Sequence, residues 1–185
     1  MSSLIIQGWF DFDNIYDRAI ADAQPGDTLI EIGVWKGASL CYLASRAKAA
    51  NKDLCVIGID NWTHVDWDGY NSIMHRDRQA GEMRSPLQQC QDNLTAAGVR
   101  DFVRLIQSDS IAAAELFDDK SIRFIFVDDT HNSPHIEKEL RAWLPKIIPG
   151  AWIAGHDYPG NIEEGVRAVF GSDVKQDRTS WTANV

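Results

Sequence analysis

Acidic residues follow the apolar runs of this sequence at regular points. Four aspartates stand at, or within two residues of, the ends of such runs: Asp60, Asp109, Asp128 and Asp157. Carboxylates in these positions can accept hydrogen bonds from a ribose or bind a divalent cation through oxygen. His131 stands three residues after Asp128 and could accept a proton in catalysis. These side chains therefore suit a site that binds a ribose and moves a proton beside it.

Each aspartate also has a purely structural interpretation. Asp60 could form a turn, or its carboxylate could accept two ribose hydroxyls at once. Asp109 could cap the short helix that follows it, or it could hold the adenine end of a nucleoside. Asp128 and Asp157 could share a divalent cation, or they could cap and turn the chain. Spacing leaves these alternatives open, whereas the position of His131 after a strand-end acid favours a catalytic role.

Buried strands must bring these side chains together. Apolar runs predict strands at 28–33, 54–60, 102–107, 122–128 and 151–155, and residues 174–185 are expected to add one or two short strands. Helices are predicted at 12–23, 40–50, 86–97, 112–117, 133–143 and 161–171. Residues 61–84 lack periodicity, which predicts a long aromatic-rich loop. The alternation predicts an α/β domain with a mostly parallel central sheet, helices on both faces, and a ligand site beyond the carboxyl ends of the strands.

Residues 28–39 read as a strand, a turn and the start of a helix, with Gly33 and Gly37 in the turn. Such a turn presents backbone N–H groups to a ligand. The spacing is Gly-x-x-x-Gly, which is neither the Gly-x-Gly-x-x-Gly of dinucleotide-binding folds nor a phosphate loop ending in Gly-Lys-Ser/Thr. A nicotinamide-dependent oxidoreductase is therefore poorly supported.

The composition limits the partners of the chain. A net charge of −9 and a pI near 4.9, with no basic cluster, argue against binding a nucleic-acid backbone. No apolar run reaches membrane-spanning length, and residues 8–13 are acidic and aromatic, unlike a signal peptide. None of the three cysteines forms a Cys-x-x-Cys pair, and Cys41 and Cys55 are expected to be core thiols. We expect one cytoplasmic domain spanning 1–185.

Segments of the chain resemble motifs of class I S-adenosylmethionine-dependent methyltransferases. These segments are 31–39, 59–62, 107–110, 126–131 and 149–158. They are most similar to the branch that includes macrocin-type sugar O-methyltransferases and cephalosporin-hydroxylase-like proteins. The similarity runs from about Trp9 to Tyr158 and implies a Rossmann-like methyltransferase fold.

The resemblance implies a cofactor site along the strand ends. Gly33 and its turn would pass the methionine part of S-adenosylmethionine, and Asp60 would hold the ribose hydroxyls. Asp109 and Ser110 would lie at the adenine. The full set of expected cofactor-binding residues is Glu31, Gly33, Trp35, Gly37, Ser39, Asp60, Asn61, Trp62, Asp109, Ser110 and Asp128.

The resemblance also implies the reacting groups. In metal-dependent members, acids like Asp128 and Asp157 bind Mg²⁺, and a group like His131 accepts the substrate proton. We therefore expect His131 and Asp128 as catalytic residues, and Asp128, Asp157 and His156 as metal ligands. His156 stands where the sugar enzymes have Glu, and Tyr158 stands where catechol-type enzymes have Asn. Because imidazole is a softer ligand than carboxylate, the Mg²⁺ site could be altered or absent.

The resulting hypothesis is a methyltransferase that moves a methyl group from S-adenosylmethionine to a small-molecule hydroxyl, such as one on a sugar or natural product. A sulfonium methyl is already electrophilic, so the protein must supply alignment and a deprotonated hydroxyl, with or without help from Mg²⁺. The alternative is a degenerate methyltransferase that binds the nucleoside as a regulatory module without turnover. Exposed tryptophans in 61–84 would suit a homodimer contact.

Overall fold

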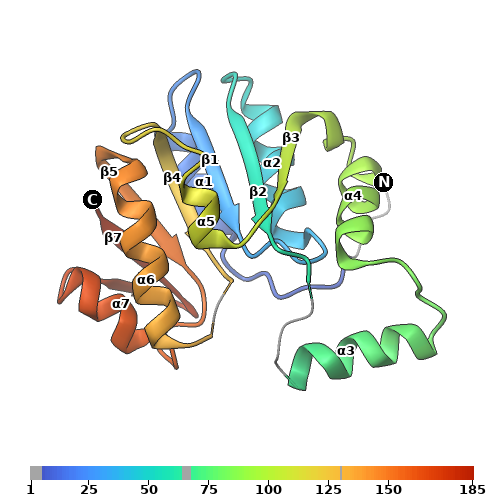
Figure 1. Ribbon diagram of the computed structural model, residues 1–185. Helices are drawn as coiled ribbons and strands as arrows, with labels where there is room; N and C mark the ends of the chain where they lie inside the picture. Colours follow the sequence, from blue (N-terminus) through green and yellow to red (C-terminus); the bar gives the residue numbers. More distant parts are fainter. Residues whose placement is uncertain (1–5, 64–67, 130) are drawn as a thin grey trace.

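The central sheet has seven strands in the order β3-β2-β1-β4-β5-β7-β6 (Figure 1). The computed structural model describes residues 6–63, 68–129 and 131–185, with only the backbone described at 68–71. The strands are β1 (Thr28–Ile32), β2 (Cys55–Asp60), β3 (Val103–Gln107), β4 (Ile122–Val127), β5 (Ile147–Gly155), β6 (Lys175–Asp177) and β7 (Ser180–Asn184). Pairing is parallel from β3 through β5, and β7 runs antiparallel to both β5 and β6. The predicted mostly parallel sheet is confirmed.

Helices cover both faces of the sheet. They are α1 (Asp13–Asp22), α2 (Ala38–Ala50), α3 (Asp68–Gln79), α4 (Pro86–Ala96), α5 (Ser110–Ala114), α6 (Ser133–Trp143) and α7 (Glu163–Phe170), with 3₁₀ turns at Arg100–Phe102 and Leu144–Lys146. In Figure 1, α1 and α2 lie behind the sheet, and α5 and α6 lie in front of it. The core is accordingly divided into two apolar clusters, one on each face.

The alternation of side chains along β1 shows how the sequence supplies both clusters. Leu29 packs into the cluster on the α1 and α2 face, whereas Ile30 and Ile32 pack into the cluster on the α5 and α6 face. Because a parallel strand is buried on both faces, nearly every residue of β1 must be apolar. Thr28, which is half-buried, and Glu31 are the polar residues of this strand, and Glu31 is buried.

The prediction that 61–84 is a loop throughout was wrong, because α3 occupies much of it and lies apart from the sheet in Figure 1. Among its described side chains, Ile73 is the one that is buried. A helix that buries a single apolar residue has no apolar stripe, so periodicity could not reveal it. Tryptophans of this segment were expected to be exposed, but Trp62 is buried, and Trp67 lies outside the described residues.

Other differences from the prediction are smaller. Cys55 is exposed rather than a core thiol, because it begins β2 at the amino edge of the sheet, while Cys41 is buried as expected. β5 begins at Ile147 rather than at 151, and α5 begins at Ser110 rather than at 112. Among the described residues, no helix is both long enough and apolar enough to cross a membrane.

Candidate active site

A cavity of about 720 Å³ opens at the carboxyl edge of the sheet. Its walls come from the segments that follow four strands: 33–35 after β1, 60–63 after β2, 128–129 after β4 and 156–162 after β5. Trp9 and Ile73 line it from the N-terminal segment and from α3. The cavity therefore lies where a parallel α/β sheet is expected to bind its ligand.

Gly33 allows the β1 turn to pass close to the end of β4. Its φ is +87°, a conformation that side chains rarely adopt. A Cβ there would overlap the carbonyl oxygen of Asp128 and lie 2.7 Å from the backbone nitrogen of Asp129. The absence of a side chain thus brings the backbone of this turn beside the acids of the β4 end.

Asp60 joins the turns that follow β1 and β2. Its carboxylate accepts hydrogen bonds from the backbone N–H of Trp35 (2.7 Å) and of Trp62 (2.6 Å). The Trp62 indole N–H donates to the Trp35 carbonyl at 2.7 Å. Burial raises the pKa of Asp60, while the backbone N–H groups act in the opposite direction. Asp60 therefore stabilises the turns, as one of its two sequence-based interpretations predicted. It also lines the cavity, and each of its carboxylate oxygens can accept a further hydrogen bond.

Glu31 lies beneath the cavity rather than in its wall. It is 1% exposed and accepts hydrogen bonds from the Ser39 hydroxyl (2.6 Å) and the Tyr16 hydroxyl (2.8 Å). Burial raises the pKa of Glu31 to about 8, against the effect of these two donors. Ser39 lines the cavity, so Glu31 acts on the site by orienting Ser39.

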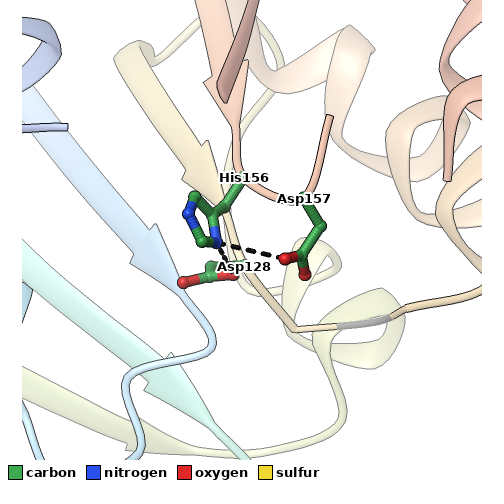
Figure 2. A group of neighbouring side chains, drawn as sticks. All are labelled: Asp128, His156 and Asp157. Carbon is green, nitrogen blue, oxygen red and sulfur yellow. Dashed lines mark ion pairs between the residues drawn. The ribbon is translucent and has the colours of Figure 1, made fainter. Parts of the chain in front are cut away.

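His156 lies between two carboxylates at the ends of β4 and β5 (Figure 2). Its Nδ1 is 3.4 Å from Asp128 Oδ1 and 3.3 Å from Asp157 Oδ1. Its Nε2 is 2.9 Å from the Thr179 hydroxyl. Burial opposes protonation of His156, but the two carboxylates outweigh it and raise the pKa to about 10. An imidazolium therefore holds Asp128 and Asp157 together at neutral pH.

His131 pairs with the other oxygen of Asp157. The distance from His131 Nδ1 to Asp157 Oδ2 is 2.5 Å. This hydrogen bond raises the pKa of His131 above its ordinary value. Burial alone would raise the pKa of Asp157, but His131 and His156 hold it well below its usual range. The carboxylate thus fixes the orientation of the His131 ring and stabilises its protonated form, as the acid of a catalytic dyad does.

The structure brings most of the predicted site residues to one cavity. Those that line it are Gly33, Trp35, Ser39, Asp60, Asn61, Trp62, Asp128, His131, His156 and Asp157. Those that do not are Glu31, Gly37, Asp109 and Ser110.

The residues outside the cavity have structural positions. Gly37 begins α2 with a φ of +80°. Asp109 caps α5, because its Oδ1 accepts from the Ala112 N–H at 3.0 Å, which is the capping interpretation of this residue. Ser110 is buried, and its carbonyl accepts from the Trp143 indole N–H.

Arg178 and Thr179 also line the cavity, although nothing in the sequence indicated them. They form the turn between β6 and β7, and Thr179 reaches His156 and the Asp11 carboxylate. Antiparallel addition of β7 beside β5 delivers this turn to the site. Strands β6 and β7 are short and largely polar, so their sequence shows little hydrophobic alternation. Only the pairing of β7 with β5 shows that the turn between β6 and β7 reaches the cavity.

The chain is similar to known proteins in sequence and in fold. Residues 30–158 match a protein family described as a methyltransferase domain. No curated protein sequence matches the chain.

Solved structures share its fold at low identity. The O-methyltransferase NovP is 18% identical with a TM-score of 0.69, covering 93% of this chain and 78% of NovP. CalS11, a TDP-rhamnose 3′-O-methyltransferase, is 15% identical with a TM-score of 0.61, covering 93% of this chain and 76% of CalS11. A Clostridium thermocellum protein named as an rRNA methylase is 14% identical with a TM-score of 0.63, covering 97% of this chain and 98% of that protein. At these identities, the likeness shows the fold alone.

Proposed function

Because this chain belongs to the methyltransferase-domain family, we propose that it transfers a methyl group from S-adenosylmethionine to a hydroxyl of a small molecule. The observation that carries the choice of a hydroxyl is the Asp157–His131 pair at the cavity. A hydroxyl must lose its proton as it attacks the methyl group, and a histidine oriented by a carboxylate is suited to accept that proton.

The cofactor would occupy the side of the cavity formed by the β1 and β2 turns. Gly33 and its turn line this side of the cavity, where the methionine part would lie, and Asp60 supplies acceptor oxygens for the ribose hydroxyls. Asp128 and His131, which follow β4, line the same cavity. The residues that would hold the cofactor and the residue that would accept the proton therefore face one cavity.

In the proposed reaction, His131 accepts the acceptor's proton through Nε2, because Nδ1 is engaged by Asp157. The hydroxyl oxygen forms a bond to the methyl carbon while the bond from that carbon to sulfur breaks. The products are the methyl ether, S-adenosylhomocysteine and protonated His131. The sulfonium methyl is electrophilic from the start, so alignment within the cavity supplies much of the acceleration.

Mg²⁺ does not fit the cluster of Asp128, His156 and Asp157 as it stands. The three side chains are close enough to share an ion. However, His156 already places a positive charge between the two carboxylates, and its pKa near 10 keeps the proton on. Mg²⁺ also prefers oxygen to imidazole nitrogen. We therefore propose that the His156 imidazolium replaces the divalent cation of metal-dependent relatives and that no step passes through Mg²⁺.

The acceptor is proposed to be small. The cavity is partly lined by Trp9, Ile73 and Arg178, a mixture that suits a ring with several hydroxyls. NovP and CalS11 are named as O-methyltransferases, and CalS11 acts on a TDP-linked sugar, which supports a sugar or a glycosylated compound. The net charge of −9 disfavours RNA.

A methyl-transfer assay tests the proposal. We expect the wild-type protein to release S-adenosylhomocysteine when a panel of hydroxylated sugars and aglycones is supplied, with no change on adding Mg²⁺. His131→Ala should lower kcat by roughly 10²–10⁴-fold, because the base is removed. His75→Ala, at an exposed position on α3, is the matched control and should leave kcat unchanged.

The pH profile of the same assay gives a second readout. The rate should rise with pH as His131 loses its proton, and Asp157→Asn should move this limb to lower pH, because Asp157 raises the pKa of His131. Equal rates for His131→Ala and the wild type would remove His131 from the mechanism.

A further inference from the structure

A second cluster of potential ligands lies behind the cavity wall. Asp129 follows β4, and His135 and Glu139 lie one turn apart on α6. One donor atom from each of the three side chains lies within 4.8 Å of the others. Residues four apart on a helix project from the same face, so α6 presents an imidazole and a carboxylate together toward Asp129.

Glu139 is the unusual member of this cluster. Glu139 is 0% exposed, and within the described part of the chain neither of its carboxylate oxygens has a hydrogen-bond partner. The Nε2 of His135 is also buried without a partner, as is the hydroxyl oxygen of Ser110. Buried polar groups are nearly always paired, and leaving them unpaired costs free energy. Four such atoms in one place require an explanation.

Glu31 provides the internal comparison. It is equally buried, but its carboxylate accepts hydrogen bonds from Ser39 and Tyr16. The chain can therefore satisfy a buried glutamate with its own donors, and around Glu139 it does not. The Ser110 hydroxyl comes near enough to Glu139 to lower its pKa, but by geometry it forms no hydrogen bond with the carboxylate among the described residues.

Protonation alone does not resolve the position of Glu139. Burial raises its pKa to about 8, which removes the charge at neutral pH. A neutral carboxyl group still has a carbonyl oxygen that needs a donor, and none of the described residues donates a hydrogen bond to either oxygen of Glu139. The neighbouring groups offer carboxylate, hydroxyl and imidazole atoms, which are all of types that can bind a metal ion.

We propose that Asp129, His135 and Glu139 bind one divalent transition-metal ion, with Zn²⁺ as the expected occupant. Two carboxylates and one imidazole are ligands that Zn²⁺ accepts, and the buried Ser110 hydroxyl or a water would complete four-coordination. Ligand atoms about 2.0–2.2 Å from one ion lie at most about 4.4 Å apart, so small side-chain rotations suffice to close the site.

This cluster differs from that of His156 in the respect that decides metal binding. Both nitrogens of the His156 ring lie beside polar partners, which are Thr179 and the two carboxylates, whereas Nε2 of His135 and both oxygens of Glu139 have no hydrogen-bond partner among the described residues. A bound ion would tie α6 to the end of β4. Because Asp129 also lines the cavity, the ion would fix one wall of the active site without contacting the reacting groups.

Calorimetric titration of the metal-stripped, full-length protein with Zn²⁺ tests this proposal, with bound zinc counted by elemental analysis. We expect one equivalent to bind to the wild type. Glu139→Gln and His135→Gln should each weaken binding by at least roughly tenfold, because each removes a ligand. Glu137→Gln, on the same helix but paired with Arg141 at the surface, is the matched control. Asp157→Asn controls for the other cluster.

Thermal unfolding separates loss of the site from loss of the fold. Zn²⁺ should raise the Tm of the wild type and of both control variants by several degrees, and should leave the Tm of Glu139→Gln unchanged. Glutamine has the shape of glutamate, so this variant is expected to fold. The proposal is overturned if the wild type binds no Zn²⁺, if neither ligand variant weakens binding, or if only Asp157→Asn does.

Discussion

Gly33 determines how close the turn after β1 comes to the end of β4. Its backbone takes a positive φ, and the space where a Cβ would stand is filled by the backbone of the β4 end. Any side chain would therefore be strained in its own dihedral angles and would also push the β1 turn away from Asp128. Because Gly33 has no Cβ, the turn after β1 can pack directly against the end of β4.

A glycine-to-alanine pair tests this reasoning. Gly33→Ala should lower the free energy of unfolding by about 3 kcal/mol or more, because conformational strain and overpacking add. Gly98→Ala is the matched control, since Gly98 also has a positive φ but a Cβ there would meet nothing within 4 Å. It should cost only about 1 kcal/mol. Urea unfolding measures both, and equal losses would show that the Asp128 contact is unimportant.

For single residues, the sequence predicted which side chains line the cavity better than it predicted the groups that each side chain contacts. Asp60, Asp128, His131 and Asp157 do line one cavity, because parallel strands end at the same edge. Asp109 follows the same rule in the sequence and yet caps a helix. The position of a residue after a parallel strand places it at this edge of the sheet. The first turn of the next helix then determines where its side chain points, as it does for Asp109.

Among the elements, α3 depends most on one contact. Asp77 of α3 forms an ion pair with Lys36 in the turn between β1 and α2. The Lys36 side chain is 3% exposed, donates to the Gln7 side chain at 2.6 Å, and lies 4.7 Å from the Trp35 ring centroid. A buried ammonium that loses its carboxylate is costly, so this pair holds α3 over the cavity.

Hydrogen exchange can measure the strength of this attachment. Asp77→Ala should accelerate amide exchange in α3 by roughly tenfold or more, which corresponds to about 1.4 kcal/mol of local opening. Exchange in α6, which packs on the sheet away from α3, should not change. Arg76→Ala, at an exposed neighbouring position, serves as the control. Unchanged exchange in α3 of Asp77→Ala would mean that other contacts hold this helix.

The elements also show why some predictions succeeded. Helices with an apolar stripe, such as α6 with Ile136, Leu140 and Trp143 buried, follow directly from spacing. Helix α3 does not, because its stability comes from an ion pair and one apolar residue rather than from a stripe. The β6 and β7 hairpin was expected only as short strands, and its place beside β5 depends on long-range pairing.

For the whole molecule, the strand order explains which segments meet at the cavity. Strands β1 and β4 are neighbours at the centre, so the glycine turn and the Asp128–His131 segment meet at one point of the edge. Strand β2 adds Asp60 on one side, and β5 adds His156 and Asp157 on the other. In the proposed function, the Asp60 side of the cavity would bind the nucleoside, and the His156 and Asp157 side would hold the reacting groups.

The central claim is that this cavity binds S-adenosylmethionine, and isothermal titration of the wild-type protein with S-adenosylhomocysteine tests it most directly. We expect one molecule to bind per chain, S-adenosylmethionine to compete with it, and NAD at the same concentration to produce no binding heat. Absence of binding by either S-adenosyl compound at saturating concentration would contradict the account.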